Sequence, residues 1–408
     1  MALIFCSMQV KNRPFLLSPA AKDYIWGGTR LREEYNKHID VTPLAETWEC
    51  STHPDGPSRV ASGVFAGEKL VDVLRAHPEF IGTHPKTDGE GGLPVLIKFI
   101  DAARDLSVQV HPSDEYARTH EHGQLGKTEM WYVLEAAPGA SLVYGFRQDL
   151  TRAMLAASLE DDTVEQYLQK VEIHRGDVFL IESGTVHAIG AGAMIVEIQE
   201  SSNLTYRMYD YHRLGKDGRP RELHIAKALD VVDLRRKPLP EQQQREREEH
   251  DGYSVELLEQ CKYFRTERLR LETMQSGGQS GQVGSVTAAQ EAPVDAQDTH
   301  VDNTSADMTQ DASSRWTKRG SAVESVAFST GPASFEVLLC VDGSGTLSGE
   351  DVEISFRKGD CIFVPADSIG LEIRGTSELL KVTYAGAGGP RKGMLPGVSP
   401  ERDVIDKK

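Results

Sequence analysis

The chain has 408 residues, a formal net charge of -17 and 26% charged residues. A chain of this length is expected to fold into two or three domains, because a single core seldom grows past roughly 250–300 residues. The acidic balance argues against nucleic acid and anionic membrane surfaces as partners, since both need a basic surface. Any anionic substrate must therefore meet a local cluster of cations.

The cysteines and the apolar runs predict a soluble, cytoplasmic protein. The five cysteines, at positions 6, 50, 261, 340 and 361, form no CxxC pair, which is typical of a reducing compartment. The apolar start is short and lacks the basic residues of a secretory signal. No run approaches the roughly 20 apolar residues of a membrane span.

Short strand-like runs dominate the first 235 residues, and Gly, Pro or Asp bounds each of them. These runs are 93–100, 106–111, 128–135, 141–146, 177–181 and 193–199. Helical periodicity appears at 70–74, 154–168 and 225–232. Because these helices do not alternate regularly with strands, we expect a sandwich or barrel rather than a doubly wound parallel sheet.

A polar segment divides the chain. Residues 238–320 are expected to be a linker or insertion, and 272–314 contain no Lys, Arg or aromatic residue. Such a stretch cannot offset its chain entropy by burial, so it is expected to be largely disordered or a long surface insertion. Strand-like runs resume at 335–341, 352–356, 361–364, 371–374 and 379–384. We therefore predict domains at 1–237 and 321–408, joined by 238–320.

The run 106–111 has an unusual polar face. Strict alternation places Ser107, Gln109 and His111 on one side of a strand and valines on the other. Adjacent polar side chains on one face need partners unless that face meets solvent or lines a site. In the next run, Lys127 and Glu129 share a face in the same way. Two polar-lined strands indicate one pocket.

A second motif lies downstream. Residues 176–187 lead from a Gly-Asp turn through an apolar strand to His187, and this pattern resembles the second conserved motif of cupins, with Glu182 in place of the usual proline. The first cupin motif usually supplies His-x-His and then a Glu. Here it reads Gln109-x-His111, followed by Glu129.

That glutamine resembles the type I mannose-6-phosphate isomerases, whose zinc is held by a Gln-x-His pair, a Glu and a distant His. Stretches 24–31, 45–49, 98–102 and 109–114 strengthen the likeness. It covers residues 14–235 strongly and 321–388 weakly. The resemblance implies an all-β dominated protein of two cupin (jelly-roll) β-barrels, with additional helices on the N-terminal catalytic domain.

The second β unit looks like a repeat of the first without its metal ligand. A motif that begins at Gly359 has the same spacing as the motif that begins at Gly176. In this second motif, the position that corresponds to His187 holds Gly370. The resemblance agrees, because shorter bacterial family members also carry a second, metal-free cupin.

The four implied ligands are Gln109, His111, Glu129 and His187, and they make chemical sense together. Zinc accepts imidazole nitrogen and carboxylate oxygen, and a catalytic site leaves one position open. Only Glu129 is anionic, so the site keeps a net positive charge that suits a Lewis acid. Iron or manganese would also fit, since no sulfur ligand is present. One Zn²⁺ per chain, with other divalent metals possible, is therefore what the resemblance implies.

The implied reaction interconverts mannose 6-phosphate and fructose 6-phosphate through a metal-stabilised enediol or enediolate. Arg207, twenty residues after His187, matches a family arginine and would stabilise the enediolate. Lys127 would stabilise charge or shuttle a proton, and Ser107 and Lys98 would bind the phosphorylated substrate. The base that takes the carbon-bound proton stays open between a metal-bound water and Lys127.

Each site residue also has a plain structural reading. Arg207 can be a surface arginine, Lys127 a structural partner of Glu129, Ser107 a buried hydroxyl and Lys98 a strand-edge lysine reaching solvent. Two other functions compete with isomerisation, namely an oxygenase-type, metal-dependent cupin enzyme and a non-catalytic sugar-binding cupin. The expected partner is a small sugar phosphate, and the chain is expected to be a monomer or a homodimer.

Overall fold

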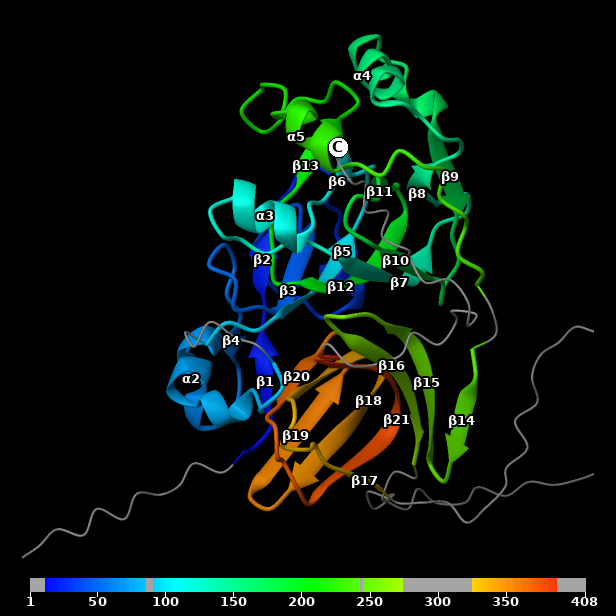
Figure 1. Ribbon diagram of the computed structural model, residues 1–408. Coiled ribbons are helices and arrows are strands. Elements are labelled where there is room, and N and C mark those ends of the chain that lie inside the picture. Colours follow the sequence, from blue (N-terminus) through cyan, green and yellow to red (C-terminus); the bar gives the residue numbers. More distant parts are fainter. Residues whose placement is uncertain (1–11, 86–90, 243–244, 274–324, 387–408) are drawn as a thin grey trace, which may run out of the picture.

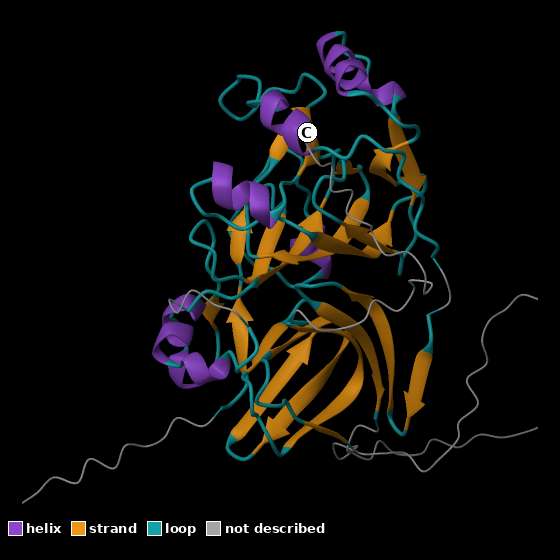
Figure 2. Ribbon diagram, in the orientation of Figure 1, coloured by secondary structure: helices purple, strands orange, loops and turns teal. Residues whose placement is uncertain are grey.

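The computed structural model describes residues 12–85, 91–242, 245–273 and 325–386. Strands dominate these residues and form two β units, one above the other in Figure 1, with a few helices at the margins (Figure 2). The prediction of an all-β dominated protein is confirmed. The prediction of closed barrels is wrong, because the sheets are open and sandwich-like. Each sheet ends in a short edge strand, and a short edge strand leaves few backbone groups unpaired.

Two antiparallel sheets form the first unit. The six-stranded sheet has the order β10 (Val178–Ile181), β7 (Glu129–Ala136), β12 (Ala193–Glu200), β5 (Val95–Asp101), β3 (Glu46–Cys50) and β2 (Ala20–Lys22). The five-stranded sheet has the order β13 (Tyr206–Tyr209), β6 (Val108–Val110), β11 (His187–Ile189), β8 (Ser141–Phe146) and β9 (Leu168–Glu172). All six strand-like runs predicted for this unit correspond to strands of these sheets.

Alternation along the strands separates two cores. Trp131 and Ile195 of the six-stranded sheet belong to one buried cluster with Ile189 of the five-stranded sheet. Val108 and Val110 belong to another, together with residues of the helices outside the five-stranded sheet. Full burial of one such side chain contributes about 1.5–3 kcal/mol. The valines of β6 therefore hold its polar face toward the space between the sheets, as the sequence pattern predicts.

Five α-helices lie among the described residues, and α3, α4 and α5 flank the first unit in Figure 1. They are α1 (Arg30–Glu34), α2 (Leu70–Ala76), α3 (Asp114–His120), α4 (Arg152–Glu160) and α5 (Ile225–Val231). Three 3-10 turns occupy Gly63–Phe65, Pro78–Phe80 and Val164–Gln166. None of the described helices is long and apolar enough to cross a membrane.

The predicted helix at 154–168 is too long. Helix α4 ends at Glu160, and strand β9 begins at Leu168. Asp162 adopts a left-handed backbone with a φ of 60°, which a helix interior does not tolerate. The helical spacing of the leucines therefore continued past the true end of the helix.

The second unit is a ten-stranded sheet that also recruits β1 (Phe15–Ser18) and β4 (Arg59–Val60). Its other strands are β14 (Arg247–His250), β15 (Tyr253–Gln260), β16 (Arg265–Glu272), β17 (Val326–Phe328), β18 (Glu336–Gly349), β19 (Val352–Arg357), β20 (Cys361–Val364) and β21 (Leu371–Thr383). Strand β1 pairs with β20, with Phe15 opposite Phe363. The predicted runs 371–374 and 379–384 are parts of one strand, β21.

Three strands lie inside the segment that the sequence assigns to a polar linker. Residues 247–272 form β14, β15 and β16, and β16 pairs with β21. Charged side chains conceal the alternation there, because they pair across strands, as Arg268 does with Glu256, while Leu269 and Leu271 are buried. The predicted disordered stretch 272–314 lies almost entirely outside the described residues.

The repeat predicted from glycine spacing is visible in the backbone. Gly176 and Gly359 have φ angles of 92° and 98°, and each precedes a four-residue strand, β10 or β20. Further on, Gly184 and Asp367 both adopt left-handed conformations, with φ angles of 86° and 58°. The two turns thus share a geometry although only the first ends in a histidine.

A buried ion pair lies where the units meet. Lys37 Nζ contacts Glu49 Oε2 at 2.7 Å and also donates to the carbonyl of Gly359 in the second unit. Truncating Lys37 to alanine leaves the Glu49 carboxylate buried without its cation. We expect this change to lower the free energy of unfolding by about 3–5 kcal/mol, measured by urea denaturation.

A matched exposed pair gives the control for Lys37→Ala. Lys170 Nζ lies 3.3 Å from Glu165 Oε2, with both side chains largely exposed to solvent. Surface pairs contribute about 0–1 kcal/mol, so Lys170→Ala is expected to change the unfolding free energy little. Equal effects of the two substitutions would show that the buried pair adds nothing beyond a surface pair.

Candidate metal centre and substrate pocket

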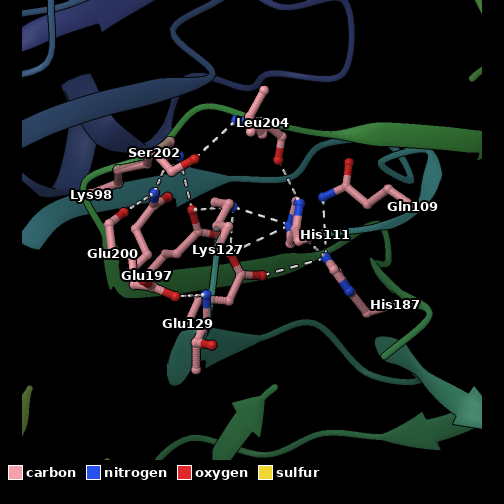
Figure 3. Close-up of polar contacts among 12 residues, drawn as sticks. Lys98, Gln109, His111, Lys127, Glu129, His187, Glu197, Glu200, Ser202 and Leu204 are labelled. Carbon is pink, nitrogen blue, oxygen red and sulfur yellow. Dashed lines mark hydrogen bonds and ion pairs between the residues drawn. The ribbon is translucent and has the colours of Figure 1, made fainter. Parts of the chain in front are cut away.

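Three buried residues of types that could hold a metal ion converge between the two sheets of the first unit. His111 follows β6, Glu129 begins β7 and His187 begins β11. One ligand atom from each lies within 4.8 Å of the others, and Figure 3 shows the side chains pointing toward one another. Cross-strand pairing brings His187 close to His111, because His187 lies opposite Gln109, two residues before His111, in the β11–β6 ladder. No other group of three such residues occurs in the described part of the chain.

Backbone carbonyls fix the protonation of both imidazoles. His111 Nδ1 lies 2.7 Å from Leu204 O, and His187 Nδ1 lies 2.8 Å from Thr185 O. Because a carbonyl only accepts, each Nδ1 must donate, and in a neutral ring the lone pair is then on Nε2. Burial lowers the pKa of His111 well below its usual value and that of His187 to about 4. Neutral rings are therefore expected at neutral pH.

The two Nε2 atoms face each other at 3.1 Å. Two lone pairs at this distance repel each other unless a cation lies between them. Glu129 Oε1 is buried, has no hydrogen-bond partner, and lies 3.4 Å from His187 Nε2. An anionic oxygen without a donor is costly to bury. The site therefore has three electron-pair donors directed at one point, which is what a divalent cation requires.

Gln109 supplies the fourth predicted donor. Its amide nitrogen lies 3.3 Å from His187 Nε2, and a flip of the amide brings its oxygen to the same place. The separations that link His187 to the other three donors are 3.1 to 3.4 Å, and His111 Nε2 lies 3.7 Å from Glu129 Oε2. Zinc bonded at 2.0–2.1 Å in a tetrahedron has ligand atoms about 3.3 Å apart. The donor set fits such an ion in both chemistry and spacing.

Lys127 lies against this group. Its Nζ is 3.2 Å from His111 Nε2 and donates to Glu129 Oε2. The same nitrogen lies 3.5 Å from Glu197 Oε1. The predicted pairing of Lys127 with Glu129 is thus present, and it places the ammonium group at the edge of the candidate metal site.

Glu197 is a site residue that the sequence analysis missed. Its carboxylate accepts from Lys98 Nζ at 2.8 Å and from Trp131 Nε1 at 3.1 Å. Burial raises its pKa, but Lys127 and Lys98 outweigh that effect and lower it to about 2. The sequence signal for Glu197 is an acidic residue inside an apolar run. The same reasoning selected Lys98, which lies directly opposite Glu197 in the β12–β5 ladder.

A cavity of about 270 Å³ is lined by Glu197 and by other residues around the candidate metal site. Its lining includes all of the predicted substrate and catalytic residues, namely Ser107, Lys98, Lys127 and Arg207, together with the predicted ligand Gln109. Ligand pockets usually have volumes of about 300 Å³ or more, so this cavity is near the lower end of their range. A larger cavity of about 510 Å³ is lined by none of the predicted residues, so we place the candidate site in the smaller one.

Arg207 approaches the cavity from β13, where it pairs with Gln109. Its Nη1 donates to Glu222 O at 2.7 Å, but its Nε is buried without a partner. Burial lowers the pKa of Arg207, and the nearby positive charge of Arg221 adds to the effect. A buried donor without a partner is costly, so this N–H is a candidate contact for a ligand, whereas water satisfies the donors of a surface arginine.

Arg221 also lines the cavity and was not predicted. Two hydrogen bonds to Asp210, at 2.8 and 2.5 Å, hold its guanidinium group. In the sequence it lies within a run of charged and turn-forming residues, which is typical of an exposed loop. Its position in the site follows only from the way that loop folds back toward β13.

The glutamate that replaces the usual cupin proline lies outside the ligand group. Glu182 Oε2 lies 3.1 Å from Lys237 Nζ, and the Glu182 side chain is 43% exposed. The turn that follows is held by a hydrogen bond from Gly184 N to His111 O at 2.9 Å. The substitution therefore leaves the approach to His187 intact.

Comparison with known proteins finds relatives along most of the chain. Sequence models described as "Phosphomannose isomerase type I, catalytic domain" and "Mannose-6-phosphate isomerase, cupin domain" match residues 15–132 and 323–384. Mannose-6-phosphate isomerase ManA of Bacillus subtilis is 37% identical over 253 residues, which are 62% of this chain and 78% of that protein.

Solved structures share the fold. A crystal structure of a mannose 6-phosphate isomerase from Bacillus subtilis matches 90% of this chain and 99% of its own, at a TM-score of 0.72 and 29% identity. A zinc-bound mannose 6-phosphate isomerase matches 91% of this chain and 99% of its own, at a TM-score of 0.59 and 18% identity. The second of these likenesses concerns the fold alone.

Proposed function

The chain belongs to the type I mannose-6-phosphate isomerase family, and from this we propose how it interconverts mannose 6-phosphate and fructose 6-phosphate. The observation that carries the proposal is the buried group of His111, Glu129 and His187 beside a cavity lined by lysine and arginine. Metal ligands suit the chemistry at the sugar carbons, and the cations suit a phosphate. A non-catalytic sugar-binding cupin would not need this ligand group.

We assign the binding of one Zn²⁺ per chain to Gln109, His111, Glu129 and His187. The donor spacings and the zinc-bound relative of the same fold support this assignment. When bound, the ion would supply a Lewis acid that stabilises oxyanion charge on the sugar. Glu129 is the only anion among the four, so the site would retain positive charge. Other divalent metals with the same donor preferences, such as iron or manganese, would also fit these ligands.

Arg207 and Lys127 are the proposed catalytic residues. Isomerisation moves a proton between neighbouring carbons and another between their oxygens, through an enediol. The unpaired Nε–H of Arg207 can donate to the oxygen where negative charge develops, and such preorganised donors are effective in a buried site. The ammonium group of Lys127 has only donors, so it can transfer a proton to a sugar oxygen and recover it.

Glu197 is proposed as a positioning residue for these lysines. One of its oxygens accepts from Lys98 and Lys127, and the other accepts from Trp131. Because both oxygens are occupied, the carboxylate is poorly suited to act as a base. Its effect is to hold two ammonium groups at the floor of the cavity.

The phosphate requires local positive charge in a chain whose net charge is -17. We propose that Ser107 and Lys98 contact the phosphorylated substrate and that Arg221 adds a second guanidinium beside Arg207. Asp210 fixes Arg221 in advance, which reduces the entropy that substrate binding would otherwise cost.

All these groups come from one chain, so the proposal holds for a monomer or a homodimer. Sugar phosphates do not cross bilayers freely, so we place the enzyme in the cytoplasm.

A coupled assay tests the proposed function. The purified protein is given mannose 6-phosphate, and fructose 6-phosphate formation is measured before chelation, after chelation and after zinc is added back. Turnover is expected to disappear on chelation and to return with zinc. Full turnover by metal-stripped protein would contradict the proposal, and stoichiometric iron with oxygen uptake would favour an oxygenase.

A further inference from the structure

The backbone around Lys127 is held by three separate acceptors. The N–H groups of residues 126, 127 and 128 donate, in that order, to Asp114 Oδ1 at 3.1 Å, Pro112 O at 3.0 Å and Glu200 Oε1 at 2.7 Å. Two of these acceptors are carboxyl groups, from helix α3 and from the end of β12. These three hydrogen bonds therefore fix the backbone on both sides of Lys127, whose side chain lines the cavity.

The two carboxyl groups accept from the N–H groups on either side of Lys127, and the charge of Asp114 acts on Glu200. Two neighbouring carboxylates repel each other and have no donor between them, so a proton on one of them relieves the repulsion. Burial raises the pKa of Glu200 to about 8, and the charge of Asp114 adds to the rise. Burial also raises the pKa of Asp114, but hydrogen bonds from Glu200, Tyr263 and Lys262 outweigh it and lower that pKa. At neutral pH Glu200 holds the proton and Asp114 is ionised.

Asp114 is in turn held by the second β unit. Tyr263 Oη donates to Asp114 Oδ2 at 2.8 Å, and Lys262 Nζ lies 3.1 Å from the same oxygen. Both residues lie in the turn between β15 and β16. Burial raises the pKa of neighbouring Cys261 to about 11, so this thiol stays neutral beside the pair.

Tight packing completes the connection at Gly126. A Cβ atom at this position would lie 2.4 Å from Asp114 N, well inside a normal contact. The start of α3 and the segment before Lys127 must therefore move together. A displacement of Asp114 would pass directly to the backbone that carries Lys127.

We propose that the turn between β15 and β16 positions Lys127 for catalysis, acting through the Asp114–Glu200 pair. The inference rests on the proposed function, because it assumes that Lys127 acts on the sugar. Tyr263, Asp114 and Glu200 are positioning residues, since none of them lines the substrate cavity or belongs to the metal-ligating group. The metal-free unit would then contribute to the chemistry of the first unit.

Tyr263→Phe tests the contact between the units. It removes the hydrogen bond from Tyr263 Oη to Asp114 and keeps the ring. We expect kcat to fall about threefold to tenfold, with KM and zinc content unchanged. Tyr253→Phe is the matched control, because Tyr253 begins β15 and stacks on His250 at 4.5 Å. A kcat equal to that of the wild type in Tyr263→Phe would overturn the proposal.

Glu200→Gln tests the carboxyl pair by a pH profile. A glutamine amide can accept from Thr128 N and donate to Asp114, but it cannot ionise. In the wild type, ionisation near pH 8 would place two carboxylates face to face and loosen the segment. At pH 9 about one tenth of the wild type keeps the proton, so the ratio of variant to wild-type kcat is expected to rise about tenfold between pH 7 and pH 9.

A constant ratio across this pH range would overturn the role of the carboxyl pair. The two proposals fail in different ways. A wild-type protein that does not isomerise mannose 6-phosphate with zinc present refutes the proposed function. Normal wild-type turnover, combined with a normal Tyr263→Phe variant or an unchanged Glu200→Gln ratio, refutes the positioning role alone.

Discussion

His187→Ala is expected to yield a folded protein that binds no zinc and isomerises mannose 6-phosphate at least about 1,000-fold more slowly. The imidazole is fully buried, and its Nδ1–H is committed to Thr185 O, so its Nε2 is preset as a donor. A Lewis acid contributes several kcal/mol to such a reaction, and each 1.36 kcal/mol is about tenfold in rate. The checks are metal content after desalting and the coupled assay.

The control for this substitution is a histidine remote from the site. The side chain of His174 is 74% exposed and lies near Glu172 and Asp177 on the surface. His174→Ala is expected to retain one zinc per chain and normal turnover. If His187→Ala also retained one zinc per chain, His187 would not be a ligand.

Arg207→Ala is expected to keep its zinc and to lower kcat by about 100-fold to 1,000-fold. Loss of one preorganised donor to a developing oxyanion typically has an effect of this size. Arg207 is not among the candidate metal ligands, so metal content should not change. Metal analysis and steady-state kinetics on the same preparation separate this result from that of His187→Ala.

Two further variants sharpen the arginine experiment. Arg207→Lys is expected to recover little of the turnover, because a single ammonium cannot reproduce the planar donor geometry of guanidinium. Arg235→Ala is the surface control, since the Arg235 side chain is 82% exposed and pairs with Asp233. A kcat for Arg207→Ala within twofold of the wild-type value would remove the arginine from the mechanism.

Local pattern predicted much of the first unit but not its pairing. Alternation and bounding glycines located β5, β7, β8 and β12 to within a residue or two, because these strands are buried between layers. The ladder that brings His187 opposite Gln109 is a matter of register between segments far apart in sequence. The expectation of closed barrels came from the family resemblance and failed where short edge strands end the sheets.

The second unit was harder to predict. Residues 247–272 read as a polar linker, because ion pairs between strands replace the apolar alternation that usually marks a sheet. Strand β1 joins this unit from the other end of the chain, and no local signal specifies that partner. Composition alone therefore underestimated how much of the chain is folded around the C-terminal strands.

The candidate site was predictable where polar residues interrupt apolar strands. Gln109 and Glu129 were selected by the face they occupy, and the family resemblance added His187 and Arg207. Glu197 carries the same signal and was overlooked, whereas Arg221 depends on the path of a loop. The catalytic and ligand roles of these residues stay predictions that the variants above test.

X-ray absorption at the zinc edge of the reconstituted protein tests the central claim most directly. The proposed ligands predict one zinc per chain with four or five nitrogen and oxygen donors at about 2.0–2.1 Å, and with the scattering of two imidazole rings. A sulfur shell at about 2.3 Å, or the absence of imidazole scattering, would contradict a site built from Gln109, His111, Glu129 and His187.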